Sequence, residues 1–514
     1  MADDITHYDA VEGYCKRLSY EAGETVQLCV STSAATFNVA VFRWGASREL
    51  VWSADRVTGR EQATQVDADA NGCGWDVSLE IPVDPNWRSG MYLVELTAHS
   101  SDIDPNRRVG YACFVVLASA AQPRNRALFV LATNTWNAYN NWGGKSLYTG
   151  GHQVSFQRPF GRGMLMRPET ERDDRKSRPR RFGEQPDVDG EIYQQYRYEH
   201  GYPGYMGSAG WFTYDRKFAA WAESNGFELD YAVSSDLETV ANLTDGYQLV
   251  IGAGHDEYWS SGMRDTVEQF VAGGGNYASF SGNTMFWRVR LERDDTTMVC
   301  YKYRAHIDDP IIESDPSAAT GMWGDPMTGR PESRLLGGAS MYGLYSRFGK
   351  ATPRGVGGFV VYRDGHWMLD GTDLRYGDVL GSDHGVVGYE TVGTRISFDE
   401  VNLPVVIADP ALPDPDDVEI VALTPSSNLA MGEYPASIAA LDDQGDLEFI
   451  AERVYGGGET ARAKVRHGNA VMLCCWPFGR DAGRVVTIGS TDWVFGLADP
   501  QVSTVTENVM RQLS

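Results

Sequence analysis

The sequence predicts an α/β plus β protein, in which a small β-sandwich precedes a larger α/β domain. Residues 16–117 alternate apolar and polar side chains, as antiparallel strands do. From residue 127 onward, continuous apolar runs alternate with amphipathic segments, which is typical of a parallel sheet with helical connections. At 514 residues, the chain also exceeds the roughly 250–300 residues at which single cores stop growing.

The first part, residues 1–120, is predicted to be an immunoglobulin-like β-sandwich. Its strand-like segments are TVQLCVS, FNVAVFRW, GCGWDVSLEIP and MYLVELTA, separated by turns of Gly, Pro, Asp and Asn. In GCGWDVSLEIP the alternation places Trp75, Val77, Leu79 and Ile81 on one face. Such a domain could bind carbohydrate or a partner, but the pattern favours a domain that braces its neighbour, since a fold alone names no ligand.

The second part, residues 125–514, is predicted to be a doubly wound α/β domain. Apolar runs predict strands in ALFVLAT (127–133), FELDYAV, YQLVIGAG and NYASFSG, and later in AVMLCCW and RVVTIGS. DRKFAAWAESNG and SSGMRDTVEQFVAGGG have helical spacing, and VSTVTENVMRQL predicts a closing helix. In the second of these helices Ser260 or Ser261 can cap the start and Gly273 can end it.

Two stretches of this domain are predicted to be long insertions. Residues from about 160 to 210 contain RDDRKSRPRR and then a cluster of tyrosines, which indicates a surface excursion near the entrance of a site or a solvated charged loop. Residues from about 310 to 468 are rich in Gly, Asp and Pro and contain few strong patterns, so we expect insertions with some β content.

Charge and cysteine usage limit the expected partners and location. The formal net charge is −25, which disfavours binding to nucleic acid or to an anionic membrane surface. The acidic N-terminus lacks the apolar core of a secretory signal, and no run approaches the roughly 20 apolar residues of a spanning helix. The seven cysteines form no CxxC pair, which suits reduced thiols, so the expected location is cytoplasmic.

Polar and aromatic residues directly follow three of the predicted strands, in NTWNAYNNWGGKSLY, HDEYWSS and NTMFWRVR. Because the carboxyl ends of parallel strands meet at one edge of a sheet, these segments are expected to form one small-molecule pocket. In an extended segment His255 and Glu257 point to the same side, so a metal or a shared water could contact both, while Asp256 points towards a structural partner. A hydrogen-bonded loop imidazole and a helix-start carboxylate are the simpler interpretations of His255 and Glu257.

Several enzyme classes lack their motifs in this sequence. There is no GxSxG elbow, no HExxH helix and no Cys/His zinc spacing. The GxG in VIGAGHDE lacks a third glycine and has acids at the phosphate position, which argues against a dinucleotide site. Cys474 and Cys475 lie in an apolar strand and are expected to be inert, and only Cys300 is close enough in sequence to the pocket to be a nucleophile.

Five segments, in the correct order, resemble the large (β) subunit of N,N-dimethylformamidase. They are NTWNAYNNWGGKSLY, VSFQRPF, GHDEYWSSGMRDTVEQFVAGGGNYASFSGN, TMFWRVRLE and VGYE, and the resemblance covers about residues 125–400 closely. It implies a catalytic domain similar to glutamine-amidotransferase-like α/β folds. It also implies a mononuclear ferric iron bound by two tyrosines and a glutamate.

The resemblance assigns roles to individual residues. Glu257 matches the iron-binding glutamate, Tyr139 the first iron-binding tyrosine, and His255 the neighbouring histidine. The second tyrosine should fall between the RPF segment and the next helix, and the candidates there are Tyr193, Tyr196, Tyr198, Tyr202, Tyr205 and Tyr214, of which Tyr198 is favoured. Further active-site polar residues of the family match Asn283, Lys302 and Glu390.

The leading hypothesis is therefore iron-dependent hydrolysis of a small amide or formamide C–N bond. Phenolate and carboxylate oxygens suit ferric iron, which would polarise the amide carbonyl. His255 could take the proton from water, and Asn283 or Lys302 could stabilise the oxyanion. The alternative is a non-catalytic carbohydrate or small-molecule binding protein, with ligand stacking on tryptophans, namely Trp136, Trp142, Trp259 and Trp287.

The chain also departs from the family it resembles. The family's enzyme carries an additional N-terminal lectin-like domain and works with a small subunit, whereas this sequence begins directly at the sandwich. We therefore expect a relative that acts on another amide or a larger substrate. Whether the chain forms a homo-oligomer or needs a small partner subunit is left open.

Overall fold

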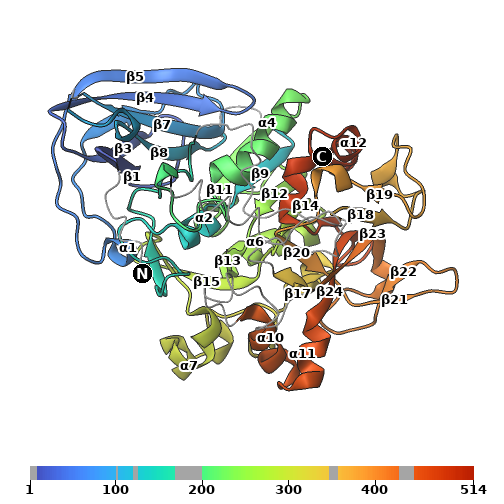
Figure 1. The fold of residues 1–514 in the computed structure, drawn as a ribbon. Coiled ribbons are helices and arrows are strands. Elements are labelled where there is room, and N and C mark those ends of the chain that lie inside the picture. The colour runs from blue at the N-terminus through green and yellow to red at the C-terminus, as the bar shows by residue number, and fades with distance from the viewer. Residues whose placement is uncertain (1–8, 100–101, 120–124, 168–198, 346–356, 428–444) are drawn as a thin grey trace.

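The computed structural model describes residues 9–99, 102–119, 125–167, 199–345, 357–427 and 445–514. It is a mixed α/β protein with several sheets, of which the largest has nine strands. Figure 1 shows the N-terminal sheets at one end of the molecule and the nine-stranded sheet running through its centre.

The N-terminal residues form two sheets with a shared core. One contains β1 (Val11–Cys15), β3 (Thr25–Thr32) and β6 (Leu79–Pro82), and the other has the order β2 (Ser19–Tyr20), β8 (Val109–Val116), β7 (Gly90–Ala98), β4 (Thr36–Trp44) and β5 (Arg48–Thr58). The predicted alternation is confirmed in β3 and β4, because Val26, Leu28, Phe37, Val39 and Val41 are all buried in this core.

One predicted strand is shorter than its pattern. In GCGWDVSLEIP the strand begins only at Leu79, and Val77 is exposed. Trp75 is buried elsewhere, because its ring packs edge-on against Trp142 of the second part of the chain, with 5.7 Å between ring centroids. An ion pair between Arg43 and Glu223 (2.7 Å) also joins the two parts. These contacts support the expected bracing role.

The nine-stranded sheet has a parallel half and an antiparallel half. Its order is β11 (Leu229–Val233), β9 (Ala127–Leu131), β12 (Leu249–His255), β14 (Asn276–Gly282), β25 (Val485–Ile488), β24 (His467–Cys475), β23 (Val418–Ser427), β18 (Phe359–Val361) and β19 (Val379–Leu380). The first five strands run parallel, and the pairs from β25 to β19 are antiparallel. The strands predicted from apolar runs are confirmed, but the sheet is mixed.

The predicted insertion at about 310–468 contributes to this sheet. Strands β18, β19 and β23 come from it and extend the sheet beyond β24. The first two are only three and two residues long, which is too short to produce a recognisable apolar run. They are held by antiparallel pairing with distant segments, which sequence periodicity does not reveal.

The two helices predicted between the strands and the predicted closing helix are present. They are α4 (Arg216–Ser224), α6 (Ser261–Ala272) and α12 (Pro500–Leu513). Ser260 caps α6, since its hydroxyl accepts the Met263 N–H at 3.1 Å, and Gly273 ends it. Besides short 3-10 helices, the other helices described are α1 (Ala68–Asn71), α2 (Thr133–Tyr139), the π-helix η2 (Trp211–Asp215), α5 (Asp236–Thr239), α7 (Ala305–Asp308), α8 (Ser333–Leu336), α10 (Gly445–Tyr455) and α11 (Glu459–Arg466).

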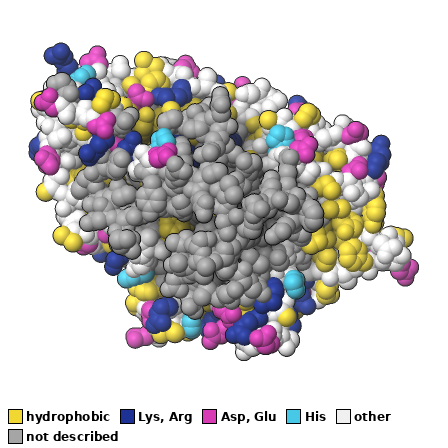
Figure 2. All heavy atoms as spheres, viewed as in Figure 1, with side chains coloured by type: hydrophobic (Ala, Val, Ile, Leu, Met, Phe, Trp, Pro, Cys, Tyr) yellow, Lys and Arg dark blue, Asp and Glu magenta, His cyan; other side chains and the backbone are white. Residues whose placement is uncertain are grey.

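Smaller sheets lie around the nine-stranded sheet. They contain β10 (Gln153–Ser155), β13 (Tyr258–Ser260), β15 (Trp287–Glu292), β16 (Thr297–Val299), β17 (Ala339–Tyr345), β20 (Glu390–Gly393), β21 (Ile396–Phe398) and β22 (Pro404–Val406). Figure 2 shows hydrophobic side chains gathered where Figure 1 places β18, β19 and β22, and Tyr376, Val379 and Phe398 are exposed. Within the described ranges, no helix has the length and apolar content needed to cross a membrane.

The strand order locates the expected binding edge. The chain passes from β9 to β11 on one side and then to β12 on the other, so the direction of winding reverses between β9 and β12. In open α/β sheets, ligands bind beyond the carboxyl ends of the strands at such a reversal. The segments after β9, β12 and β14 all lie at this edge.

Candidate metal centre

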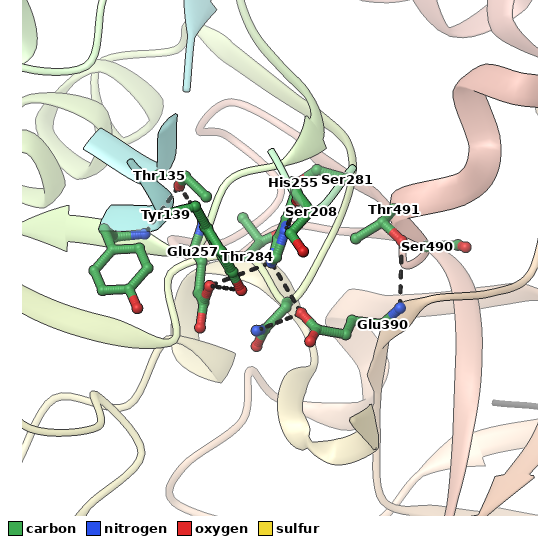
Figure 3. Close-up of polar contacts among 12 residues, drawn as sticks. Thr135, Tyr139, Ser208, His255, Glu257, Ser281, Thr284, Glu390, Ser490 and Thr491 are labelled. Atoms are coloured by element: carbon green, nitrogen blue, oxygen red, sulfur yellow. Dashed lines mark hydrogen bonds and ion pairs between the residues drawn. The ribbon is translucent and has the colours of Figure 1, made fainter. Parts of the chain in front are cut away.

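A buried polar cluster lies at this edge of the sheet, and each of the three strands supplies part of it. Tyr139 ends α2, which follows β9; His255 ends β12 and Glu257 comes two residues later; Asn283 follows β14. All four side chains are buried. Figure 3 shows Tyr139, Glu257 and His255 pointing towards one another from these elements.

The Glu257 carboxylate is the centre of the cluster. The Tyr139 hydroxyl donates to its Oε2 at 3.0 Å, and the Tyr148 hydroxyl lies 2.9 Å from Oε1 and 2.8 Å from Oε2. The two phenol rings stack with centroids 4.1 Å apart. The backbone N–H of Glu257 donates to Thr135 Oγ1 at 2.9 Å, which fixes the segment after β12 to α2 (Figure 3). Two phenols, one at the end of α2 and one in the loop that follows it, therefore meet one carboxylate.

His255 is held in one tautomer. Its Nδ1 lies 2.7 Å from the carbonyl oxygen of Ser208, which can only accept, so Nδ1 carries a hydrogen. Nε2 then faces two carboxylates, 2.9 Å from Glu390 Oε2 and 3.3 Å from Glu257 Oε2, at angles that form no hydrogen bond. A lone pair between two anions is unfavourable unless a cation or a proton lies among them.

Three residues with metal-ligating side chains thus meet in one place. Ligand atoms of His255, Glu257 and Glu390 all lie within 4.8 Å of one another in a buried position, so this triad could hold a metal ion. The Asn283 Nδ2 donates to Glu390 Oε2 at 2.8 Å and orients that carboxylate. The backbone N–H of Glu390 donates to Thr491 Oγ1 at 3.3 Å (Figure 3).

The electrostatics of the cluster match this arrangement. Burial alone would lower the pKa of His255, but Glu390 and Glu257 outweigh it and raise this pKa to about 10. Burial would raise the pKa of Glu257, but His255 and Lys302 bring it below its ordinary value. Burial and the charge of Glu257 raise the pKa of both Tyr139 and Tyr148 well above the usual value. With no other cation present, the phenols keep their protons and the imidazole binds one.

Lys302 supplies positive charge beside the phenols. Its Nζ lies 3.3 Å from the centroid of the Tyr148 ring and 5.0 Å from that of Trp287, so the ammonium rests on aromatic faces. The backbone of Lys302 is left-handed (φ 51°), as are those of Asn283 (φ 50°) and Tyr389 (φ 25°), the residue before Glu390. Each such conformation costs on the order of 1–3 kcal/mol, and strain of this kind clusters at functional sites.

The structure brings together six of the seven residues predicted for the site. They are Tyr139, His255, Glu257, Asn283, Lys302 and Glu390. The seventh, Tyr198, lies outside the described residues. Of the other tyrosines considered, Tyr205 lies near the phenol pair, with its ring centroid 5.8 Å from that of Tyr139 and 5.3 Å from that of Tyr148.

Tyr148 is the residue that sequence reasoning missed. It ends the same polar and aromatic segment that carries Tyr139, after the turn at Gly143 and Gly144. Its backbone returns to α2, because the Leu147 N–H donates to the Ala138 carbonyl at 3.1 Å. A tyrosine after a double-glycine turn within a site segment is the signal that could have identified it.

Asp256 and the tryptophans have structural roles. Asp256 points away from Glu257, as expected, and accepts the Trp259 indole N–H at 2.9 Å. Trp136 donates its indole N–H to Asp215 at 3.0 Å, and Trp142 packs on Trp75. All four tryptophans proposed to stack on a ligand are buried in the protein. Their packing does not favour the stacking role.

The cysteines considered earlier are not activated. Cys300, Cys474 and Cys475 are buried. Burial raises the pKa of Cys300 and of Cys474 to about 12, so these thiols stay protonated at neutral pH. This environment does not favour a cysteine nucleophile at Cys300.

Gly254 is required where β12 meets the π-helix. Its φ of 73° is left-handed, and a Cβ there would overlap Tyr214, whose ring lies 6.3 Å from that of His255. We expect Gly254→Ala to lower the free energy of unfolding by about 2–5 kcal/mol, from backbone strain and overpacking. The matched control is Gly226→Ala, where φ is 79° and a Cβ meets nothing within 4 Å. Urea denaturation would contradict this prediction if both variants lost the same stability.

The fold and the site together define a class of protein: a mixed α/β protein with a buried centre that could hold a metal. This centre lies at the carboxyl edge of the main sheet. A family model described as "N,N-dimethylformamidase beta subunit-like, C-terminal" matches residues 38–507. The chain belongs to this family, as the segments quoted above indicated.

Individual relatives are more distant. The N,N-dimethylformamidase beta subunit of Alcaligenes sp is 35% identical over 72 residues, which are 14% of this chain and 9% of that protein. The match thus spans a small part of that relative. Among solved structures, murine CEACAM1b (12% identity, TM-score 0.13) is similar over 24% of this chain and 62% of its own. A family 123 glycoside hydrolase from Clostridium perfringens (10% identity, TM-score 0.10) is similar over 25% and 31%. Neither likeness carries an argument.

Proposed function

We propose that this protein is an iron-dependent amidohydrolase that cleaves the C–N bond of a small amide or formamide. The observation that carries the proposal is the 3.0 Å contact between the Tyr139 phenol and the Glu257 carboxylate, in a buried cluster that also contains Tyr148. These oxygens come from segments far apart in the chain and meet where a ligand of the sheet should bind. Membership of the N,N-dimethylformamidase beta subunit-like family supports the same chemistry.

The residues present fit an iron ion. Phenolate and carboxylate oxygens are hard donors that suit ferric iron, and the Nε2 of His255 faces the carboxylates without a hydrogen bond. We assign Glu257 and Tyr139 as protein ligands and propose Tyr148 as a second phenol, while Tyr198, outside the described residues, stays a prediction. Bound there, iron would supply Lewis acidity that polarises the amide carbonyl.

The remaining residues would handle protons and charge. His255 is aimed into the cluster by the Ser208 carbonyl and can take a proton from the attacking water, whose oxygen forms the new bond to the carbonyl carbon. As the C–N bond breaks, the same proton can pass to the leaving amine nitrogen. Lys302 brings positive charge towards the oxyanion, and Asn283 holds Glu390 against His255.

Three further predictions from the sequence also belong to the proposal. The resemblance implies a glutamine-amidotransferase-like form of the main domain, while the strand pattern predicts an immunoglobulin-like form of the N-terminal sheets and the cysteine pattern predicts a cytoplasmic location. We further propose that the protein binds a small amide substrate and binds neither nucleic acid nor a membrane. Light scattering of the purified chain, with and without a small partner subunit, measures whether a homo-oligomer forms.

The proposal predicts a coloured iron protein. We expect about one iron per chain and a phenolate-to-iron charge-transfer absorption. Tyr139→Phe and Tyr148→Phe should each weaken or shift this band, whereas Tyr376→Phe, at an exposed tyrosine, should not. Release of amine from a panel of amides tests the reaction itself. Colourless, iron-free protein that releases no amine would instead favour the non-catalytic binding protein.

A further inference from the structure

Arg158, of the RPF segment, is a buried cation that the proposed reaction does not use. It is 1% exposed and lies just after β10. Its Nε donates to the Ser155 carbonyl at 3.0 Å and its Nη1 to the Trp142 carbonyl at 2.6 Å. Its Nη2 donates to the Asn140 carbonyl at 2.9 Å and reaches both the carbonyl and the Oδ1 of Asn137, at 3.3 and 3.2 Å.

Apart from the Ser155 carbonyl of β10, the oxygens that Arg158 contacts belong to the end of α2 and the residues just after it. The last carbonyls of a helix have no partner within the helix and carry partial negative charge, which a cation stabilises. The carbonyls of Asn137, Asn140 and Trp142 lie at or just after this end, and the guanidinium contacts all three. The planar Arg158 guanidinium therefore sets the direction in which the chain leaves α2.

This arrangement is costly, which indicates a specific role. All of these acceptor oxygens belong to uncharged groups. Burying a charge costs several kcal/mol in general, and the nearby Asp69 carboxylate, which favours the charged form of Arg158, offsets only part of this cost. Burial lowers the pKa of Arg158 to about 10, so it remains charged at neutral pH. An apolar side chain would fill the same space without that cost but would remove the guanidinium donors from the Asn140 and Trp142 carbonyls, whereas the Asn137 carbonyl would keep the Asn140 N–H at 3.2 Å.

The chain that Arg158 holds carries both phenols of the centre. Tyr139 is the last residue of α2, and Tyr148 follows the loop that returns to the Ala138 carbonyl. The residues after Arg158 also hold this part of the chain. Asn140 Nδ2 donates to the Pro159 carbonyl at 2.9 Å, and Asn140 Oδ1 accepts the Gly161 N–H at 2.9 Å. A shift of this loop would move both hydroxyls relative to Glu257.

We propose that Arg158 is a positioning residue. By donating hydrogen bonds to the carbonyls at the end of α2, it fixes the Tyr139–Tyr148 pair against Glu257. It touches neither substrate nor the reacting atoms. Its effect on turnover rests on the proposed function, but its effect on the loop does not. A misplacement of about 1 Å can lower turnover by about 10²-fold, so a loss of that order in kcat, with a smaller change in KM, is expected for Arg158→Met.

The test compares Arg158→Lys and Arg158→Met with Arg264→Met in the full chain. Arg264, in α6, is the control, because it is also fully buried and donates to the carbonyls of Arg330 and Pro331, although it also forms an ion pair with Glu268 at 2.6 Å. Hydrogen exchange should speed up over residues 137–148 in both Arg158 variants, less in the lysine variant. It should not do so there in Arg264→Met. The charge-transfer band should shift in the Arg158 variants alone.

Each outcome decides the proposal. Exchange over residues 137–148 that is no faster in the Arg158 variants than in Arg264→Met overturns it. The proposal is also overturned if exchange is faster in the Arg158 variants but the charge-transfer band of their iron-loaded form is unchanged. If wild-type protein lacks iron, the proposed function fails, and hydrogen exchange alone then supports or overturns the role of Arg158. If Arg158→Met does not fold, the same comparison is made with Arg158→Lys.

Discussion

Replacing Glu257 with glutamine should remove the iron and with it the activity. The Glu257 carboxylate is the group that both phenols contact, and it belongs to the buried triad with His255 and Glu390. A neutral amide offers a weaker ligand and cannot balance the charge of a buried cation. Because Lewis-acid help is worth several kcal/mol, we expect amine release to fall by about 10³-fold or more. Metal analysis and amine release measure the two effects.

The neighbouring carboxyl supplies the control. Asp256 is as buried as Glu257 but accepts the Trp259 indole N–H instead, so Asp256→Asn should keep both iron and activity. Wild-type iron content in Glu257→Gln would contradict our assignment of this carboxylate as a ligand. Loss of iron in both variants would show that the segment, and not the carboxylate, is what matters.

His255→Ala should keep its iron and lose turnover. We expect kcat to fall by about 10²–10⁴-fold, the usual range for a missing general base. His366→Ala is the control, because His366 is also paired with a glutamate, Glu419, at 3.1 Å but lies outside the cluster. Steady-state rates at saturating amide, together with metal analysis, test this prediction.

Two results would change the role of His255. Full activity in His255→Ala would remove it from the reaction. Loss of iron in that variant would instead make Nε2 a metal ligand, in keeping with its place 3.3 Å from Glu257 and 2.9 Å from Glu390.

The central sheet could be predicted because its strands are buried on both faces. β9, β12 and β14 have continuous apolar runs, and the Ser260 cap and Gly273 end of α6 are local signals that the structure confirms. The antiparallel half could not be predicted. β18 and β19 are very short; β18 is fixed by pairing with β23, far along the chain, and β19 by pairing with β18.

Part of the site was also predictable, because it follows directly from a predicted strand. His255 and Glu257 are two residues apart after an apolar strand, so their common direction follows from strand geometry. Glu390 has no such local signal, because it reaches His255 only through the packing of β20, and resemblance alone suggested it. Tyr148 was missed because its contact with Glu257 depends on a loop that folds back on α2, which periodicity does not describe.

The central claim is that the buried oxygens around Glu257 hold an iron that activates an amide. Anomalous diffraction at the iron absorption edge, from crystals of active protein, tests it most directly. We predict a peak in contact with both the Glu257 carboxylate and the Tyr139 phenol oxygen, which already lie 3.0 Å apart. Active crystals with no iron peak between these two groups would contradict it.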